Sequence, residues 1–284
     1  MNKINHSIVK YTGSKWRMAP WIISFFPKHK IYVEPFGGAA NVLLRKIPSR
    51  KEVYNDLYSE IYNLFYVLRN YPKELIRLCT RTPYSYQQFK KRFIYFKSKN
   101  RILRAWVFIY ASFFGVGGVP RSFRKTGFMG NFRNSSPELG WDNIPENLSK
   151  VAIRFKKVLI HKKEYKWCLK YYDGKNTLFY LDPPYVLSTR KSAKYKHEMK
   201  NKSHIEMLKL INNLQGYVVI SGYESKLYEK YLEKKFGWHK FTRNSINMAK
   251  NKRIECVWLS PRTYKIYKKS HKSLKDESLW VRHE

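Results

Sequence analysis

Hydrophobic and polar positions follow a regular order near the start of the chain. Between residues 30 and 70, the short apolar runs IYVEPF and EVYND are typical of strands, and the segments GGAANVLLRKI and SEIYNLFYVLRN that follow them have helical spacing. In the second of these segments, Ile61, Leu64 and Phe65 fall on one face of a helix. This order predicts a βαβ unit, which contributes parallel strands to a sheet.

The same alternation resumes from about residue 158. The runs VLIHKKEY, TLFYLD, GYVVISGY and RIECVWLS indicate strands, whereas KWCLKYY and HIEMLKLINNL indicate a helical turn and a helix. The two ends of the chain therefore predict one α/β fold with a mostly parallel sheet.

Residues 72–150 differ in character from the segments on either side. ILRAWVFIYASFF predicts an apolar helix, and the following GVGGVPRSFRKTGFMGNFRNSS is rich in glycine, arginine and asparagine with little periodicity. A long irregular segment inside a compact domain is usually functional. We therefore predict a mainly helical insertion at 72–150 between the two parts of the α/β domain, 1–71 and 151–262. The charged tail, 263–284, favours a solvated or frayed terminus.

The charge of the chain narrows the class of partner. The 284 residues include 57 Lys and Arg against 20 Asp and Glu, a net charge of +37. Such an imbalance opposes compaction and is best tolerated when a polyanion is the partner, which makes nucleic acid the first candidate. Aromatic residues make up 17% of the chain and suit base stacking, although most of them are expected in the core or at its rim.

Cysteine usage and hydropathy indicate the compartment. Cys79, Cys168 and Cys256 are scattered and form no CxxC pair, which argues against a disulfide framework and a zinc site. The N-terminus has no apolar signal region, and the longest apolar stretch, between Arg104 and Arg121, is shorter than the roughly 20 residues of a membrane span. We expect a soluble cytoplasmic protein that does not bind a membrane.

The first predicted strand ends in a turn with the features of a ligand site. In YVEPFGG, Glu34 ends the strand, Phe36 follows, and Gly37 and Gly38 allow backbone to approach a ligand closely. Asp56 ends the second strand, near the position where nucleotide-binding folds hold ribose hydroxyls. The GxGxxG cradle is absent, which disfavours a pyrophosphate cofactor such as NAD. Alternatively, the glycines only form a turn and Asp56 caps a helix; this motif alone does not decide between the two.

The segment LDPPY combines an acid with a rigid backbone. Asp182 follows the apolar run TLFYL, and ligands bind outside the carboxyl ends of such buried strands. Pro183 and Pro184 fix the backbone and present Tyr185 at a set distance. A carboxylate and a carbonyl beside an aromatic ring would fit a planar ring that bears an amino group. The alternative is a helix N-cap with proline at the first helical position, but double proline at a central strand end favours function.

The N-terminal segment KYTGSKW is a weaker motif. Tyr11, Gly13 and Lys15 resemble a small aromatic and basic clamp ahead of the first strand. By itself this pattern favours a solvated basic arm.

Taken together, these motifs resemble the Dam-like family of DNA adenine-N6 methyltransferases, which use S-adenosylmethionine (SAM). The family order of clamp, E-P-F-x-G-G turn, acid-ended second strand, insertion and D-P-P-Y matches KYTGSK, VEPFGGAANVLL, YNDL, residues 72–150 and LDPPY. The similarity continues through YKHEM, SHIEMLKLI, VVISGYES and RIECVW. It implies a Rossmann-like SAM-dependent methyltransferase sheet with a target-recognition insertion. The insertion differs from that of GATC-reading members, so the recognition sequence stays open.

The resemblance also implies roles for individual residues. Asp56 would hold the ribose hydroxyls, and Asp182 would lie between SAM and the adenine. The residues implied to bind SAM are Tyr11, Lys15, Glu34, Phe36, Gly37, Gly38, Asp56 and Asp182. The implied catalytic loop consists of Asp182, Pro183, Pro184 and Tyr185.

The reaction that follows needs no metal. Two acceptors, the Asp182 carboxylate and the Pro183 carbonyl, would make the adenine amine more nucleophilic toward the methyl group of SAM. Within double-stranded DNA the adenine must be flipped out, and Tyr185 would be its stacking surface. The expected DNA contacts, each of which could instead be a solvated charge or polar side chain, are Lys10, Arg121, Arg124, Lys125, Asn131, Arg133 and Asn134.

Two other functions remain open at this level. One is a SAM-dependent methyltransferase that acts on RNA or on a protein amide. The other is a catalytically silent DNA-binding relative, which is disfavoured because Lys15, Asp56 and Asp182 are all present. The sequence leaves open the oligomeric state and whether a cognate restriction endonuclease exists.

Overall fold

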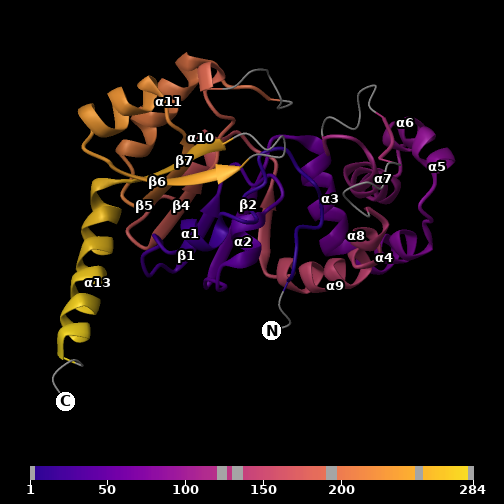
Figure 1. Cartoon of the computed structure of the whole chain (residues 1–284), viewed down its shortest axis with the longest axis horizontal. Coiled ribbons are helices and arrows are strands. Elements are labelled where there is room, and N and C mark those ends of the chain that lie inside the picture. Colours follow the sequence, from indigo (N-terminus) through magenta and orange to yellow (C-terminus); the bar gives the residue numbers. More distant parts are fainter. Residues whose placement is uncertain (1–3, 120–126, 130–136, 190–196, 247–251, 281–284) are drawn as a thin grey trace.

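The structure is a computed structural model of the chain (Figure 1), and it describes residues 4–119, 127–129, 137–189, 197–246 and 252–280. Arg121, Arg124, Lys125, Asn131, Arg133 and Asn134, the residues expected to contact DNA through the insertion loop, lie outside the described residues.

A single mixed sheet forms the centre of the described fold, with the strand order β3-β2-β1-β4-β5-β7-β6. The strands β1 to β5 pair in parallel, whereas β7 runs antiparallel to both β5 and β6. The strands are β1 (Ile31–Glu34), β2 (Lys51–Asn55), β3 (Val158–His161), β4 (Thr177–Leu181), β5 (Tyr217–Tyr223), β6 (His239–Ile246) and β7 (Lys252–Leu259). The expectation of a mostly parallel α/β sheet is confirmed.

Helices cover both faces of the sheet. In Figure 1, α10 and α11 lie on one side of it and α1 and α2 on the other, while α3 to α9 extend beyond the β2 and β3 side. The helical elements are α1 (Ala19–Ile23), α2 (Asn41–Arg45), α3 (Ser59–Asn70), α4 (Pro72–Arg81), α5 (Tyr86–Lys90), α6 (Arg92–Phe96), α7 (Arg101–Phe114), α8 (Pro137–Asp142), α9 (Ile144–Phe155), α10 (Tyr165–Tyr171), η2 (Leu187–Thr189), α11 (Asn201–Asn212), α12 (Lys226–Tyr228), η3 (Glu229–Lys235) and α13 (Pro261–Trp280).

The strand β4 is buried on both faces, which explains its unbroken apolar sequence. Leu178 and Tyr180 belong to one hydrophobic cluster, whereas Phe179 and Leu181 belong to a second cluster on the opposite face. Successive side chains of a strand point to opposite faces, so this strand joins both halves of the core. The acid that follows, Asp182, is therefore positioned by a strand whose five residues are all buried.

The helices of the insertion share their core with the sheet. Phe108 of α7 lies in the same hydrophobic cluster as Tyr54 of β2, and its ring meets that of Tyr58, just before α3, with ring centroids 6.0 Å apart. The expected boundary between residues 150 and 151 falls inside α9. The segment is mainly helical where it is described, while its independence as a domain stays a prediction.

Two elements differ from expectation. β6 was not predicted, because its residues Thr242, Arg243 and Asn244 are exposed at the sheet edge and therefore show no apolar alternation. The tail begins as α13, whose Thr263 is buried and whose Tyr264 stacks on His239 with centroids 3.9 Å apart. The expected frayed terminus is therefore wrong for the first turns of this helix, because tyrosines at helical spacing dock it on the sheet.

A buried charge cluster ties α9 to the sheet. Glu52 of β2 binds the Lys46 ammonium at 2.6 Å with one oxygen and pairs with Arg154 of α9 through the other. Arg154 also donates to the carbonyl of Leu43 at 3.1 Å. The side chains of Lys46 and Glu52 are each only 3% exposed, so neither charge can rely on water.

We predict that Glu52→Gln lowers the free energy of unfolding by about 3–5 kcal/mol, because it leaves two buried cations without a counter-charge. Urea denaturation followed by circular dichroism measures this loss. The matched control is Glu146→Gln, which breaks the exposed pair with Lys150 and should change stability little. Equal effects of the two substitutions would contradict the assignment.

Candidate active site

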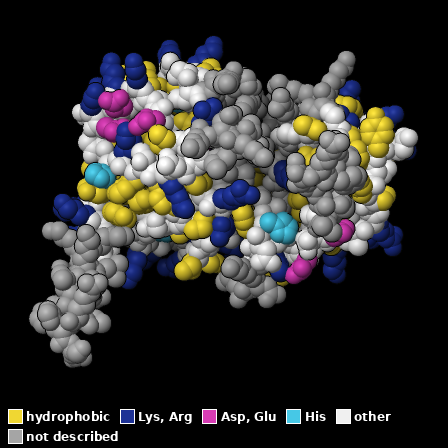
Figure 2. All heavy atoms as spheres, in the orientation of Figure 1, with side chains coloured by type: hydrophobic (Ala, Val, Ile, Leu, Met, Phe, Trp, Pro, Cys, Tyr) yellow, Lys and Arg dark blue, Asp and Glu magenta, His cyan; other side chains and the backbone are white. Residues whose placement is uncertain are grey.

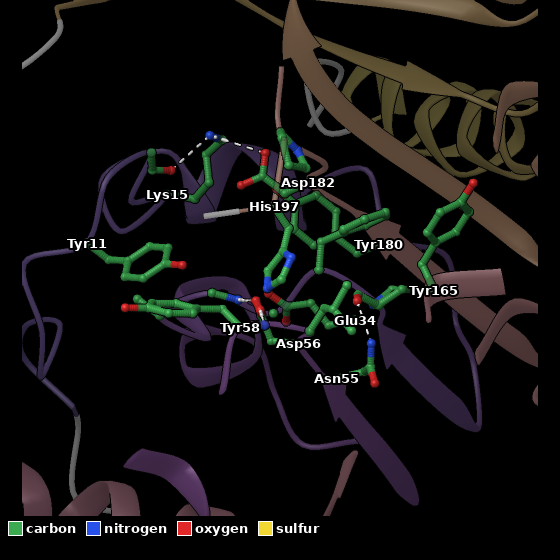
Figure 3. Close-up of a pocket in the computed structure, with 18 of the residues that line it drawn as sticks. Tyr11, Lys15, Glu34, Asn55, Asp56, Tyr58, Tyr165, Tyr180, Asp182 and His197 are labelled. Atoms are coloured by element: carbon green, nitrogen blue, oxygen red, sulfur yellow. Dashed lines mark hydrogen bonds and ion pairs between the residues drawn. The ribbon is translucent and has the colours of Figure 1, made fainter. Parts of the chain in front are cut away.

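A cavity of about 330 Å³ opens at the carboxyl ends of the central strands (Figure 3). It lies where the connections after β1 and β4 diverge, at the edge where open α/β sheets bind ligands. Its lining includes Tyr11, Lys15, Glu34, Phe36, Gly37, Gly38, Asn55, Asp56, Tyr58, Tyr165, Tyr180, Asp182, Pro184 and His197. The predicted SAM-binding residues are thus brought together around one cavity.

The glycine turn after β1 is held by Asp56. Its Oδ2 accepts the Gly38 N–H at 2.8 Å, and its Oδ1 accepts the Tyr58 N–H at the start of α3, also at 2.8 Å. At Gly37, an added Cβ would lie 2.2 Å from a ring carbon of Tyr54, so only glycine fits. Asp56 therefore both supports the turn and lines the cavity. Burial raises the pKa of Asp56 to about 6, against the opposing effect of the two N–H groups.

Glu34 is the second buried acid of this wall. It accepts the Tyr32 hydroxyl at 2.9 Å and the Leu43 N–H at 3.2 Å, and it is 2% exposed. Burial raises the pKa of Glu34 to about 8, so the neutral form prevails at pH 7. The cavity wall can thus contain a second carboxyl group near Asp182 without a second negative charge.

The Asp182 side chain is fixed from two other segments. The Lys15 ammonium lies 3.3 Å from Oδ1, and the Ser221 hydroxyl of β5 donates to the same oxygen at 2.9 Å (Figure 3 shows the Lys15 contact). Lys15 also donates to the Gly13 carbonyl at 3.0 Å. The helix-cap alternative for Asp182 is wrong, because the next helical element, η2, begins only at Leu187 and the Asp182 side chain turns to Lys15 and Ser221 instead.

Lys15 is not part of a solvated arm. Its side chain is 6% exposed, and the segment that carries it is paired with the insertion, since the Thr12 N–H donates to the Val119 carbonyl at 3.1 Å and the Val119 N–H donates to the Lys10 carbonyl at 2.9 Å. The Lys10 ammonium lies 5.0 Å from the ring centroid of Phe113. The clamp thus lies between the cavity and the insertion, while Lys10 as a DNA contact stays a prediction.

Tyr185 is held more tightly than the sequence indicates. It is 5% exposed, its hydroxyl donates to Glu255 at 2.9 Å, and the Lys15 ammonium lies 4.7 Å from its ring centroid. The ring of Tyr223 meets it edge-on with centroids 4.5 Å apart. Of the predicted catalytic loop, Asp182 and Pro184 line the cavity, whereas Pro183 and Tyr185 are buried and are not part of its lining.

Sequence reasoning missed several residues of this site. Ser221 stands near the end of a strand beside β4 and could have been found from that position, because neighbouring parallel strands end at one edge. Tyr165 stacks on Phe36 with ring centroids 5.2 Å apart, and Asn55 donates to the Pro35 carbonyl at 2.8 Å. Contacts such as the one between Glu255 and Tyr185 have no local sequence signal, since they join distant segments.

The part of the chain that the structure describes contains neither a metal-binding cluster nor a membrane-spanning helix. No three His, Cys, Asp or Glu side chains in these ranges gather closely enough to hold a metal ion. None of the helices in the described part of the chain combines the length and hydropathy needed to cross a membrane.

Comparison with known proteins identifies the family. The model of the D12 class N6 adenine-specific DNA methyltransferases matches residues 11–245, which include the whole cavity lining. The chain belongs to this family. As a member of this family, it is an adenine-specific DNA methyltransferase by class.

Similar curated proteins agree with this assignment. The type II methyltransferase M1.LlaDCHI of Lactococcus lactis subsp. cremoris is 27% identical over 271 residues, which cover 88% of this chain and 92% of the relative. The modification methylase LlaI of Lactococcus lactis subsp. lactis is 25% identical over 65% of this chain and 30% of its own length. The DNA adenine methylase of Vibrio cholerae is 26% identical over 44% of this chain and 47% of its own length.

We predict that Ser221→Ala lowers the free energy of unfolding by about 1–3 kcal/mol, because the buried Tyr180 hydroxyl, 2.8 Å from Ser221, loses its acceptor. The double variant Tyr180→Phe/Ser221→Ala should recover most of this stability. Thermal and urea unfolding measure both variants. A double variant less stable than Ser221→Ala would contradict this reading.

The free energy of unfolding should also depend on pH through Glu34. A carboxyl group whose folded-state pKa is raised stabilises the fold most at low pH, and this contribution is lost as the pH rises toward the folded pKa. For Glu34 the loss runs from about pH 4.5 to about pH 8. Glu34→Gln keeps an acceptor for Tyr32 and Leu43 and should show a smaller fall in unfolding free energy over that range. Parallel pH profiles of the two proteins would contradict this.

Proposed function

We propose that this methyltransferase binds SAM in the cavity and transfers its methyl group to N6 of an adenine presented at Asp182. The observation that carries the proposal is the fixed orientation of Asp182 at the cavity rim. Its Oδ1 is engaged by Lys15 and Ser221, and no hydrogen bond to Oδ2 occurs among the described residues, so Oδ2 can accept a hydrogen bond from a substrate amine.

The cavity suits the chemistry of SAM. A volume of about 330 Å³ falls within the range of small-ligand sites, about 300–1,000 Å³. Each carboxylate oxygen of Asp56 already accepts one backbone N–H and can accept a second hydrogen bond. The ribose hydroxyls of SAM would donate these second bonds. Phe36 and Tyr165 form an aromatic wall for the adenine of the cofactor, and Tyr11 and Lys15 close the other side. Bound SAM would supply an electrophilic methyl group.

The acceptor loop performs the activation. The lone pair of an adenine amine is delocalised into the ring, and hydrogen bonds to Asp182 Oδ2 and the Pro183 carbonyl would localise it on nitrogen. Pro184 has no N–H, and it holds Pro183 extended, so this carbonyl keeps its direction. Because Glu34 is neutral at pH 7, it adds no negative charge beside Asp182. Asp182 would also hold the proton that the methylated amine releases.

Duplex DNA is the proposed substrate form. Basic side chains are spread over the face seen in Figure 2 and acidic ones are few, in agreement with a net charge of +37. An adenine must leave the duplex to reach a recessed carboxylate, and Tyr185 and Lys10 remain the proposed stacking and base contacts. The residues 72–150 are proposed as the recognition domain. Two relatives are named as a type II methyltransferase and a modification methylase, which supports a restriction-modification role with a partner endonuclease. The proposed location is the cytoplasm.

The test is methyl transfer from labelled SAM to a sequence-diverse duplex library, with nucleoside mass spectrometry of the product. We expect N6-methyladenine from the native protein. Asp182→Ala should lose activity by about a thousandfold or more, and Asp182→Asn, which keeps one acceptor oxygen, should lose less. Both variants should still bind SAM by calorimetry. Native protein that binds SAM yet forms no N6-methyladenine would refute the proposal.

We also predict that SAM affinity depends on the ionisation of Asp56. Ribose hydroxyls donate to the carboxylate, and its pKa lies at about 6, so the charged acceptor is present above that pH and is lost below it. The affinity should fall about tenfold as the pH falls from about 7.5 to about 5. Asp56→Asn should bind more weakly and show a flatter profile. Calorimetry across this range measures both, and an unchanged native profile would exclude the role.

A further inference from the structure

Glu255 is a carboxylate behind the acceptor loop to which neither the motifs nor the family comparison gives a role. It stands on β7 opposite Tyr223 of β5, two strands away from β4. Its Oε2 accepts the hydroxyl of Tyr185 at 2.9 Å. The edge of the sheet where β7 joins β5 thus reaches the last residue of the acceptor loop.

The hydrogen bond between Tyr185 and Glu255 fixes the direction of the Tyr185 ring, which the prolines do not control. Pro183 and Pro184 set the backbone, but the direction of the ring depends on side-chain torsions. Tyr223 meets the ring from one side at an interplanar angle of 74°, and the Lys15 ammonium lies over its face at 4.7 Å. The hydroxyl bond to Glu255 holds the far end of the ring. Together these contacts hold the ring in one orientation.

Burying the Glu255 carboxylate at this position costs free energy, because burial disfavours its charged form. Burial raises the pKa of Glu255, and the nearby Lys15 ammonium opposes this effect. The Lys15 ammonium therefore pairs with Asp182 and also acts electrostatically on Glu255. A charged acceptor makes a stronger bond to a hydroxyl than a neutral one does. Such a bond suits a ring that must keep its plane when a base enters and leaves.

We propose that Glu255 is a positioning residue that acts on methyl transfer through Tyr185, by fixing the ring against which the flipped adenine stacks. The inference rests on the proposed function. Glu255 does not contact the adenine itself, because its carboxylate is directed to the hydroxyl end of Tyr185.

A double-mutant cycle tests this inference with duplex DNA and SAM. Tyr185→Phe removes the hydroxyl and keeps the ring, whereas Glu255→Ala removes the acceptor. We expect each to lower kcat about tenfold while the Kd for SAM changes less than about twofold. Because both substitutions break the same bond, the double variant should also lose about tenfold. Glu255→Gln, which keeps an acceptor oxygen, should recover most of the activity.

The controls separate positioning from folding. Glu233 accepts the indole N–H of Trp258 at 3.0 Å, a similar bond from an aromatic side chain, away from the cavity. Glu233→Ala should lower the melting temperature and leave kcat unchanged. As a direct readout, 2-aminopurine at the target base should report altered stacking in Tyr185→Phe and in Glu255→Ala, and the native signal in Glu233→Ala.

The outcomes are distinguishable. A loss of about a hundredfold in the double variant would mean that Glu255 acts independently of Tyr185, and it would overturn the inference while native methylation continues. If Glu233→Ala lowered kcat as much as Glu255→Ala does, the loss of activity would reflect a loss of stability. This result would also overturn the inference. A native protein without methylation activity would instead refute the proposed function.

Discussion

The proposed reaction depends on one constraint: the carboxylate of Asp182 must be held in one orientation, toward the substrate, among several buried groups. Asp182 meets this constraint because Lys15 and Ser221 both bind its Oδ1. Glu34, another acid of the cavity lining, has a pKa of about 8 and adds no charge beside Asp182 at neutral pH. In the proposed mechanism, Asp182 is the carboxylate that faces the substrate, and the neutral Glu34 adds no competing charge beside it.

This arrangement follows from how the chain brings distant segments to one edge. Asp182 comes directly after β4, which is buried on both faces and therefore cannot shift in register without moving two cores. Lys15 arrives from the N-terminal segment, which is fastened to the insertion through Val119. Ser221 arrives from β5. A loop alone would not aim the carboxylate this well, because its backbone would keep more conformational freedom.

Much of the fold and part of the site could be predicted from the sequence, since apolar periodicity and the turn after β1 are local signals. The motif at this turn, together with the acid that ends the second strand, correctly predicted that Glu34 and Asp56 lie at one cavity. The strand β6 was missed because its exposed edge residues show no apolar alternation. The start of α13 was missed because its packing depends on a partner elsewhere in the chain, His239. The bond between Tyr185 and Glu255 was missed for the same reason: it depends on β7 pairing antiparallel with β5, and no spacing in the sequence encodes that pairing.

The most direct test of the central claim is a structure of the enzyme with S-adenosylhomocysteine and a duplex that contains its methylated sequence in unmethylated form. The measurement is the distance from the adenine N6 atom to Asp182 Oδ2 and to the Pro183 carbonyl oxygen. The account predicts both distances at about 2.7–3.2 Å, with Oδ1 still held by Lys15 and Ser221. An extrahelical adenine whose N6 lies beyond about 3.5 Å from Asp182 would contradict it.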